Sequence, residues 1–278
     1  MSDPIRVGLL QTRTPATTAQ ALAHVSPLIR QAAAEGARFI ATPEAVNVLE
    51  RDRAKLAPQL RPPEQDEVVL GLRALAAELG VELLIGSALV SRPDGACANR
   101  SILVGPDGGI VATYDKIHMF DVDLPSGERY RESAVYTPGE AAVVAPSLLG
   151  PLGMTVCYDV RFPALYKAVA DAGAVAITVP AAFTRPTGEA HWETLLRARA
   201  IETGSYVLAP AQGGVHEDGR GTWGRSTVID PWGVVIAKLD HDEPGVLIAD
   251  LDLAKALATR AAIPALKNAR AFASPARP

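Results

Sequence analysis

The sequence predicts an α/β fold in which two similar halves pack sheet against sheet, with helices on the outside. Short apolar segments alternate with segments of helical periodicity along the chain. The order strand, helix, strand, helix, strand, hairpin occurs twice, and Gly80 and Gly204 end corresponding helices. Convergent α/β patterning is the alternative explanation for these two halves. The 278 residues are enough to bury a large core as one domain or as two small ones.

In the first half, the apolar segment 5–10 predicts a strand, and the periodic segment 18–34 predicts a helix that Gly36 ends. The turn 105–109, rich in Gly with Pro and Asp, separates the last two strands of this half. The other predicted elements are a strand at 38–42, a helix at 64–79, and strands at 81–87, 100–104 and 110–114.

In the second half, the apolar segment 154–157 predicts a buried strand, and Pro163 suits the first turn of a helix at 163–171. The Asp-Pro-Trp-Gly segment 230–233 predicts the turn of the closing hairpin. The other predicted elements are a strand at 174–179, a helix at 189–203, a strand at 206–209, and hairpin strands at 226–229 and 234–238.

The two halves also correspond residue by residue in places. The strand end at Pro43-Glu44 matches the strand end at Pro180-Ala181, so Glu44 has an alanine as its counterpart. If the sheets pack face to face, strand ends from both halves line one cleft, and only one half carries the carboxylate. The long segment 115–137 between the halves is expected to be an active-site or interface loop, because connections of this length are uncommon in compact domains.

The composition is that of an ordinary soluble protein. The 27 basic and 31 acidic residues give a net charge of −4, without a basic cluster that would indicate nucleic-acid binding. We find no apolar run long enough to span a membrane and no secretory signal pattern at the start. The two cysteines, Cys97 and Cys157, are too few for a disulfide framework, so we expect a cytoplasmic location.

Three ionisable side chains follow apolar strands, and together they suggest nucleophilic catalysis. Glu44, Lys116 and Cys157 each stand just beyond a predicted strand. Taken singly, they fit a solvated loop acid, a surface cation and a buried core thiol. Brought together in a partly dry cleft, they would provide a base, an oxyanion stabiliser and a nucleophile. The start of the helix after Cys157 would also favour its thiolate.

Three windows in register resemble the signature segments of the nitrilase superfamily of carbon-nitrogen hydrolases. The windows are Thr42-Pro43-Glu44, Tyr114-Asp115-Lys116-Ile117-His118-Met119-Phe120-Asp121 and Val156-Cys157-Tyr158-Asp159-Val160-Arg161-Phe162-Pro163. The later segments 190–202 and 230–233 are most similar to the branch of deaminated glutathione amidases and ω-amidases. The resemblance covers nearly the whole chain. It implies a single domain over 1–278, folded as a four-layer α-β-β-α sandwich with an internal pseudo-two-fold repeat.

The resemblance also implies a mechanism. Cys157 attacks an amide carbonyl while Glu44 takes the thiol proton and passes it to the departing ammonia. Lys116 and the backbone N–H of Tyr158 stabilise the oxyanion, and water then hydrolyses the thioester. Neither a metal nor an organic cofactor is required. A second glutamate is expected to orient Lys116 and the substrate; Glu132 fits the pattern better than Glu128, and a solvated loop acid is the alternative.

Two other assignments stay open from the sequence. Cysteine hydrolases often use histidine as base, and His191 could approach Cys157 with Asp159 orienting the imidazole. That arrangement would leave Glu44 and Lys116 without a role. A catalytically idle binding or scaffold protein is the other possibility, but such a protein would be expected to lack one of the three residues, and here all three are present.

The substrate expected from the resemblance is a small anionic amide such as deaminated glutathione. Alternatives are 2-oxo-dicarboxylic monoamides and N-carbamoyl compounds, and nitriles are not ruled out. A carboxylate would need a basic anchor, and the arginines expected to border the cleft are Arg129, Arg131, Arg161 and Arg185. Phe183, Thr184 and His191 could shape the pocket, although packing explains Phe183 and His191 as well, and an ion pair explains Arg161. Family members pair, so we expect a homodimer or a larger homo-oligomer.

Overall fold

Two six-stranded sheets form the centre of the computed structural model, which describes residues 3–124 and 127–275. Outside the described residues lie 1–2, 125–126 and 276–278. All of them belong to the predicted single domain, and 125–126 also belong to the predicted long loop. In spatial order, the first sheet consists of β16 (Gly245–Leu251), β1 (Ile5–Gln11), β2 (Phe39–Ala41), β3 (Glu82–Ser91), β4 (Cys97–Val104) and β5 (Ile110–Asp115).

The second sheet has the same plan. In spatial order, it consists of β15 (Val235–Lys238), β14 (Thr227–Ile229), β11 (Tyr206–Ala209), β10 (Ala176–Thr178), β9 (Leu152–Met154) and β8 (Val143–Ala145). In each sheet three parallel strands, β1-β2-β3 or β9-β10-β11, continue into an antiparallel hairpin. An antiparallel strand, β16 or β8, closes the other side. The predicted repeat is confirmed, and each half gains one strand that the sequence pattern did not indicate.

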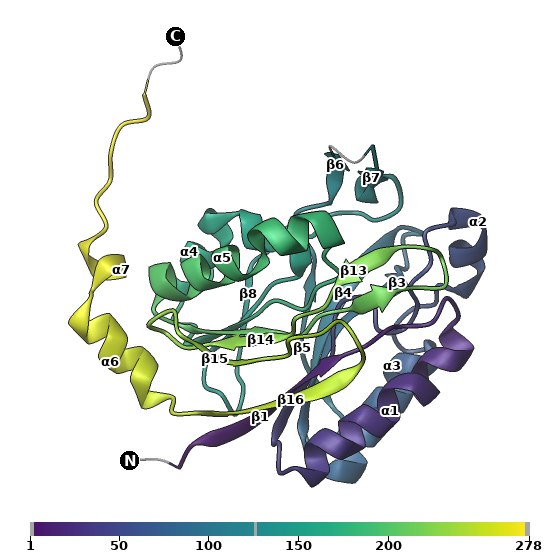
Figure 1. Ribbon diagram of the computed structural model, residues 1–278, viewed down its shortest axis with the longest axis horizontal. Helices are drawn as coiled ribbons and strands as arrows, with labels where there is room; N and C mark the ends of the chain where they lie inside the picture. Colours follow the sequence, from purple (N-terminus) through teal and green to yellow (C-terminus); the bar gives the residue numbers. More distant parts are fainter. Residues whose placement is uncertain (1–2, 125–126, 276–278) are drawn as a thin grey trace.

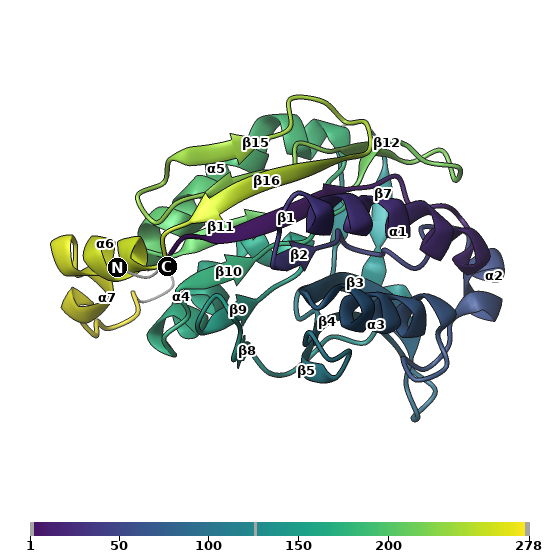
Figure 2. The ribbon, with the colours of Figure 1, turned by 90° about the horizontal axis from the view of Figure 1, so that it is seen from below.

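Helices cover the outer faces of both sheets, so the predicted α-β-β-α layering is confirmed. Figure 1 shows α4 (Pro163–Asp171) and α5 (Arg185–Thr203) on one side of the strands, and α1 (Thr18–Ala34) and α3 (Glu67–Leu79) on the other. Figure 2 gives the same arrangement from below. Within residues 3–124 and 127–275, no helix is both long and apolar enough to cross a membrane.

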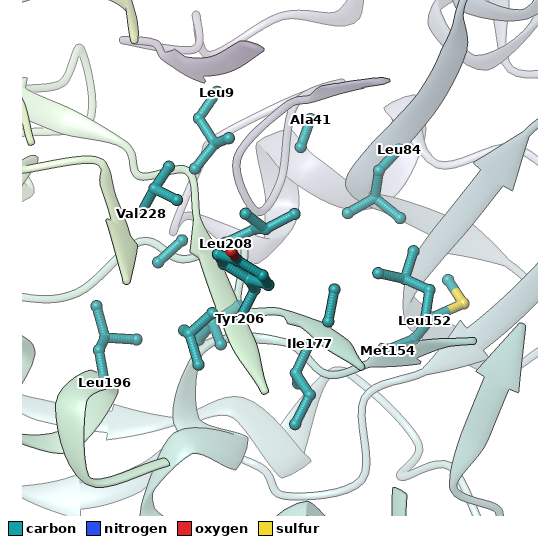
Figure 3. Close-up of a cluster of buried hydrophobic side chains, with 14 of the residues drawn as sticks. Leu9, Ala41, Leu84, Leu152, Met154, Ile177, Leu196, Tyr206, Leu208 and Val228 are labelled. Carbon is teal, nitrogen blue, oxygen red and sulfur yellow. The ribbon is translucent and has the colours of Figure 1, made fainter. Parts of the chain in front are cut away.

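Alternation along the central strands sends side chains into two apolar layers. Leu9, Ala41 and Leu84 point from the first sheet toward the second, where Met154 and Leu208 meet them (Figure 3). Their neighbours on the same strands instead pack under the outer helices; the examples are Leu10, Ile40 and Leu83. Strands buried on both faces are typical of parallel sheets covered by helices, which explains why their sequences are apolar throughout.

Several short elements complete the chain. Most of them gather at the end of the molecule where the parallel strands finish, as β6, β7, β13 and α2 do in Figure 1. These elements are α2 (Arg53–Leu56), β6 (Asp121–Asp123), β7 (Arg129–Arg131), β12 (Gly213–Val215), β13 (Gly221–Trp223), α6 (Ala254–Ala262), α7 (Ala265–Asn268) and short 3₁₀ turns at Ala57–Gln59, Glu132–Ala134 and Cys157–Arg161. The predicted irregular loop 115–137 therefore contains a small hairpin, β6–β7.

Two predicted helix starts differ from the structure for identifiable reasons. The helix expected from residue 64 begins at Glu67, because the Asp66 carboxylate caps it by accepting from the Val68 and Val69 N–H groups. The helix expected from residue 189 already begins at Arg185, because Pro186 fits the first turn, where no N–H donor is needed. By contrast, the helices predicted at 18–34 and 163–171 are confirmed at both ends.

Candidate active site

Cys157 lies in a tight turn and not, as predicted, at the end of a strand. Strand β9 ends at Met154, and Cys157 begins a 3₁₀ turn with a φ of 51°, a left-handed conformation that β-strands do not contain. Its backbone N–H donates to the Pro180 carbonyl (2.9 Å), and the Asp159 carboxylate accepts from the Val156 N–H (2.9 Å). A strained residue held by its surroundings is a frequent mark of functional sites.

Glu44 follows β2 and is held by donors from both halves of the chain. Its side chain is buried, and Oε2 accepts a hydrogen bond from the Ala182 N–H (2.8 Å) in the second half. The Cys157 thiol lies beside this carboxylate, and each group shifts the pKa of the other. The Glu44 carbonyl accepts from the side chain of Gln212 (2.9 Å). The base predicted from the first half therefore contacts the nucleophile predicted from the second.

Lys116 is the centre of a buried ion cluster. Its side chain is 2% exposed, and Nζ donates to Glu44 Oε1 (3.0 Å) and to both carboxylate oxygens of Glu132 (2.9 and 2.8 Å). Glu132 also accepts from the Phe120 N–H (2.6 Å). Glu128 instead lies toward the outer part of the pocket, where the Tyr130 hydroxyl contacts it (3.3 Å). Of the two candidates, the structure brings Glu132 to Lys116.

Asn99 joins the two carboxylates, and sequence reasoning missed it. From β4, its Nδ2 donates to Glu44 Oε1 (2.9 Å) and to Glu132 Oε1 (3.2 Å). Its backbone carbonyl accepts a hydrogen bond from the backbone N–H of Lys116 (2.9 Å). The buried Oδ1 atom has no hydrogen-bond partner within the described part of the chain, and Asn99 lines the pocket. The only sequence signal was a polar residue at a buried strand position.

The electrostatics of this cluster fix the proton on the thiol at rest. Burial raises the pKa of Cys157 well above its usual range, the Glu44 charge raises it further, and Lys116 opposes the shift only in part. The expectation that the helix start favours a thiolate is therefore not met. Burial works against ionisation of Glu44, but the Lys116 charge and hydrogen bonds from Cys157, Lys116 and Asn99 outweigh it and lower its pKa.

Lys116 stays charged although it is buried. Burial by itself lowers the pKa of this ammonium, but the charges of Glu132 and Glu44 outweigh burial and hold the pKa well above its usual value. The site thus combines a protonated thiol, an ionised base beside it and a fixed positive charge. This combination suits proton transfer from sulfur to Glu44 as the sulfur attacks a carbonyl carbon.

The cluster opens into a pocket of about 390 Å³. Four residues predicted to contact the substrate line it: Tyr158, Phe183, Thr184 and Arg131. Aromatic side chains form one wall, with the Phe120 ring 5.1 Å from the rings of both Tyr130 and Tyr158. Across residues 3–124 and 127–275, no group of three or more His, Cys, Asp and Glu side chains is arranged to hold a metal ion.

Arg161 and His191, also predicted as substrate contacts, lie outside the pocket lining formed by the described residues. The Arg161 guanidinium covers the ring of Phe183 at 5.4 Å and contacts Nδ1 of the exposed His191 (3.3 Å). Arginine stacks readily on aromatic faces, and this packing accounts for the position of Arg161. Arg185 is likewise paired elsewhere, with Asp242.

The alternative arrangement with His191 as base does not form. Asp159, its expected orienting residue, is fully buried and accepts from the Tyr114 hydroxyl (2.7 Å), and its Oδ1 contacts His118 Nδ1 (2.7 Å). His118 in turn stacks on Phe162 with ring centroids 3.6 Å apart. Asp159 thus bonds both the segment after Lys116 and the Cys157 turn, and it positions one against the other.

Comparison with known proteins gives a consistent result. Residues 6–261 match the family described as carbon-nitrogen hydrolase. Over 272 residues the chain is 40% identical to the deaminated glutathione amidase of Yersinia enterocolitica, covering 96% of this chain and 94% of that protein. The NitFhit protein of C. elegans superposes with a TM-score of 0.89 at 30% identity; the match covers 97% of this chain and 66% of that longer one.

A third similar protein is an amidase whose active-site cysteine forms a covalent adduct. The amidase of Nesterenkonia sp. AN1 superposes with a TM-score of 0.79 at 27% identity, covering 96% of this chain and 94% of that one. That structure, of a Glu-to-Gln mutant, shows covalent addition of the acetamide moiety of fluoroacetamide at the active-site cysteine. With the family match over most of its length and the three signature windows meeting in one pocket, this chain belongs to the carbon-nitrogen hydrolase family.

Proposed function

We propose that the protein is an amidase that hydrolyses the C–N bond of a small anionic amide through a thioester on Cys157 and releases ammonia. The observation that carries the proposal is the contact between the thiol and the ionised Glu44, beside the charged Lys116, in one pocket. The family match and the amidases among its relatives support the reaction class.

The first half of the proposed reaction forms the thioester on Cys157 and releases ammonia. The Cys157 sulfur attacks the amide carbonyl carbon while its proton passes to Glu44, and the carbonyl oxygen becomes an oxyanion. Lys116, with the Tyr158 N–H at the start of the turn, stabilises that charge, because the first N–H groups of a helix lack helical acceptors. Glu44 then gives its proton to the nitrogen, ammonia leaves, and a thioester remains.

Water completes the cycle. Glu44 takes a proton from water as the oxygen attacks the thioester carbonyl, the acid product forms, and the Cys157 sulfur leaves and is protonated again. Glu132 keeps Lys116 in place through both stages, since it holds the ammonium with two oxygens. Tyr158, Phe183, Thr184 and Arg131 would form the substrate pocket.

Among substrates, we propose deaminated glutathione or a similar anionic amide, since the Yersinia relative is named for that activity. The described residues that line the pocket include six basic and four acidic side chains, an excess of positive charge that suits an anion. Monoamides of 2-oxo-dicarboxylic acids fit the same charge, and N-carbamoyl compounds are a further alternative.

The test compares three proteins with a panel of deaminated glutathione, ω-amides, N-carbamoyl compounds and nitriles. Wild type should release ammonia and show an acyl adduct on Cys157 by mass spectrometry. Cys157→Ala should reduce the rate by at least about 1000-fold, while Cys97→Ala, which changes the other cysteine outside the pocket lining, should leave it unchanged. Turnover that survives Cys157→Ala would rule out the mechanism, and ammonia from nitriles alone would rule out the amidase assignment.

We further propose a homodimer located in the cytoplasm. Exposed apolar side chains gather beside α5, where Ile201 is 55% and Trp232 53% exposed, and such patches often mark protein interfaces. Both cysteines are free, as is usual in a reducing compartment. The net charge of −4 supports a small-molecule substrate in place of a nucleic-acid partner.

A further inference from the structure

Arg220 reaches the active-site pocket from the turn between β12 and β13, a segment that sequence reasoning left without a role. Its side chain is 21% exposed and lines the pocket. Its Nε atom is buried and donates to no acceptor within residues 3–124 and 127–275. A buried donor without an acceptor is unfavourable, so its presence at a pocket wall needs an explanation.

The neighbouring acid does not satisfy this guanidinium. Asp218 Oδ2 lies 3.4 Å from Arg220 Nη2, which is a long ion-pair contact, and that oxygen likewise has no hydrogen bond within the described part of the chain. The contact holds Nη2 near Asp218 without forming a hydrogen bond, and the partly exposed guanidinium still lines the pocket. A planar guanidinium held in this way is prepared to bind a carboxylate through two parallel N–H donors.

Several other basic groups of the pocket are already engaged. Lys116 is bound by Glu44 and Glu132. Arg131 donates to both oxygens of Asp123 (2.9 Å each) and to the carbonyls of Val122 and Tyr130. Arg129 lies 3.4 Å from the same Asp123. These two arginines share one carboxylate within the β6–β7 hairpin, so the donors that point to Asp123 are already engaged before a ligand arrives.

Arg51 adds charge next to Arg220. Its Nη2 lies 3.8 Å from the position that a Cβ would occupy at Gly219, the residue before Arg220. Both arginines also act on one wall of the pocket: burial and the Glu128 charge raise the pKa of Tyr130, and the charges of Arg220 and Arg51 oppose that rise. The two guanidiniums therefore lie on the same side of the pocket as Tyr130.

We infer that Arg220 binds a carboxylate of the substrate other than the group that reacts with Cys157, and that Arg51 supplements its charge at the pocket mouth. The inference rests on the proposed function for the identity of the reacting group. It specifies the substrate class as small amides that carry a carboxylate beyond the scissile amide. It assigns the anchor to an arginine that is not among the four named from the sequence; of those four, Arg161 and Arg185 lie outside the pocket lining.

The experiment measures binding apart from turnover. In a Cys157→Ala background, isothermal titration calorimetry compares glutaramic acid, the monoamide of a five-carbon dicarboxylic acid, with neutral valeramide. Arg220→Gln should weaken glutaramic acid binding by about 10- to 100-fold and leave valeramide within about threefold. Arg220→Lys, which keeps the charge but loses the fork, should give an intermediate loss. Arg185→Gln, which removes an arginine paired with Asp242 outside the pocket lining, is the matched control and should change neither.

The outcomes separate this inference from the proposed function. Equal losses for both ligands, or full binding of glutaramic acid by the Gln and Lys variants, would overturn the role of Arg220, whatever the turnover of wild type. Weakened binding of the carboxylate alone supports it, even if the protein with Cys157 intact releases no ammonia from glutaramic acid. That last result would count against glutaramic acid as a substrate or against the proposed reaction, but not against the anchor.

Discussion

At the scale of single residues, the site works because neighbouring groups in the cluster set one another's charge. Glu44 remains ionised because Lys116 lies 3.0 Å away and Asn99 donates to it. Lys116 remains charged only because Glu132 and Glu44 offset its burial. Removing one partner of such a cluster leaves the others as unpaired buried charges, which costs several kcal/mol. The effects of substitutions in this cluster should therefore not add.

The first prediction concerns the pH dependence of kcat/KM. The reaction needs ionised Glu44, whose pKa is lowered, and charged Lys116, whose pKa is raised. Activity is therefore lost on the acid side only when pH falls below the usual range of glutamate, and on the alkaline side only above the usual range of lysine. We expect a flat profile between about pH 6 and pH 9. An inflection near pH 6.5 would instead indicate a histidine base.

The second prediction concerns Asn99. Because its amide donates to Glu44 and Glu132, Asn99→Ala should lower kcat/KM by about 10- to 100-fold. It should also move the acid limb of the pH profile upward, since the hydrogen bond from Asn99 helps to lower the pKa of Glu44. Asn99→Asp, which adds a third carboxylate to the cluster, should be inactive. An Asn99→Ala enzyme with reduced activity but an unmoved acid limb would contradict this assignment.

The sequence identified the residues that follow apolar segments and missed one residue inside a strand and one in a short hairpin. Glu44, Lys116 and Cys157 follow apolar segments, so their positions indicated a common edge of the sheets. Asn99 lies inside β4, and its partners are far away in the chain, so only the folded structure reveals them. Arg220 lies in a short hairpin without any apolar pattern, and its importance depends on an acceptor that is missing.

At the scale of elements, the strands determine where the catalytic groups lie, and their exact ends depend on side-chain contacts. The predicted strand 154–157 continued too far because Thr155 and Val156 are apolar or β-branched, as strand residues are. In the structure, the Thr155 hydroxyl donates to the Thr178 carbonyl (2.7 Å) and Asp159 captures the Val156 N–H. These contacts bend the chain into the Cys157 turn, and local propensity gives no indication of them.

The third prediction tests the junction behind the two catalytic turns. A Cβ at Gly86 in β3 would lie 1.9 Å from the Thr42 carbonyl oxygen and 2.6 Å from Pro180 Cβ. Thr42 leads to Glu44, and the Pro180 carbonyl accepts from Cys157, so added bulk would push both turns apart. We expect Gly86→Ala to destabilise the fold by about 3 kcal/mol, in the range of overpacked cores, and to reduce activity strongly.

Thermal unfolding and ammonia release measure the two effects of Gly86→Ala. The control is Gly245→Ala in β16, where the nearest atoms would be 3.7 Å from the new Cβ, an ordinary contact. The control should retain wild-type stability and rate. If Gly86→Ala unfolded and reacted like wild type, the close packing of β3 against the two turns would not control the site.

At the scale of the whole molecule, the repeat creates one active site and not two. The strand ends of both halves meet, yet Ala181 occupies the position that corresponds to Glu44. The second half instead contributes the nucleophile and the Ala182 N–H that binds Glu44. The order of predicted strands and helices was enough to predict two packed halves, because each half repeats the same order. That order did not reveal β16, whose pairing with β1 joins segments more than 200 residues apart.

The last prediction concerns the surface beside α5. Ile201 on α5 contacts the turn that carries Trp232, since a Cβ at Gly233 would lie 2.5 Å from Ile201 Cγ1, and both side chains line a second hollow with Ile263. These three side chains are each more than half exposed, which is unfavourable for a monomer in water. If this patch joins two copies, Ile201→Asp should raise the dimer Kd by at least about 30-fold, since it places a charge in an apolar contact.

Sedimentation velocity measures the shift in Kd. The control is Leu70→Asp on α3, on the opposite side of the sandwich. A wild-type monomer, or dissociation caused by Leu70→Asp and not by Ile201→Asp, would contradict the proposed interface.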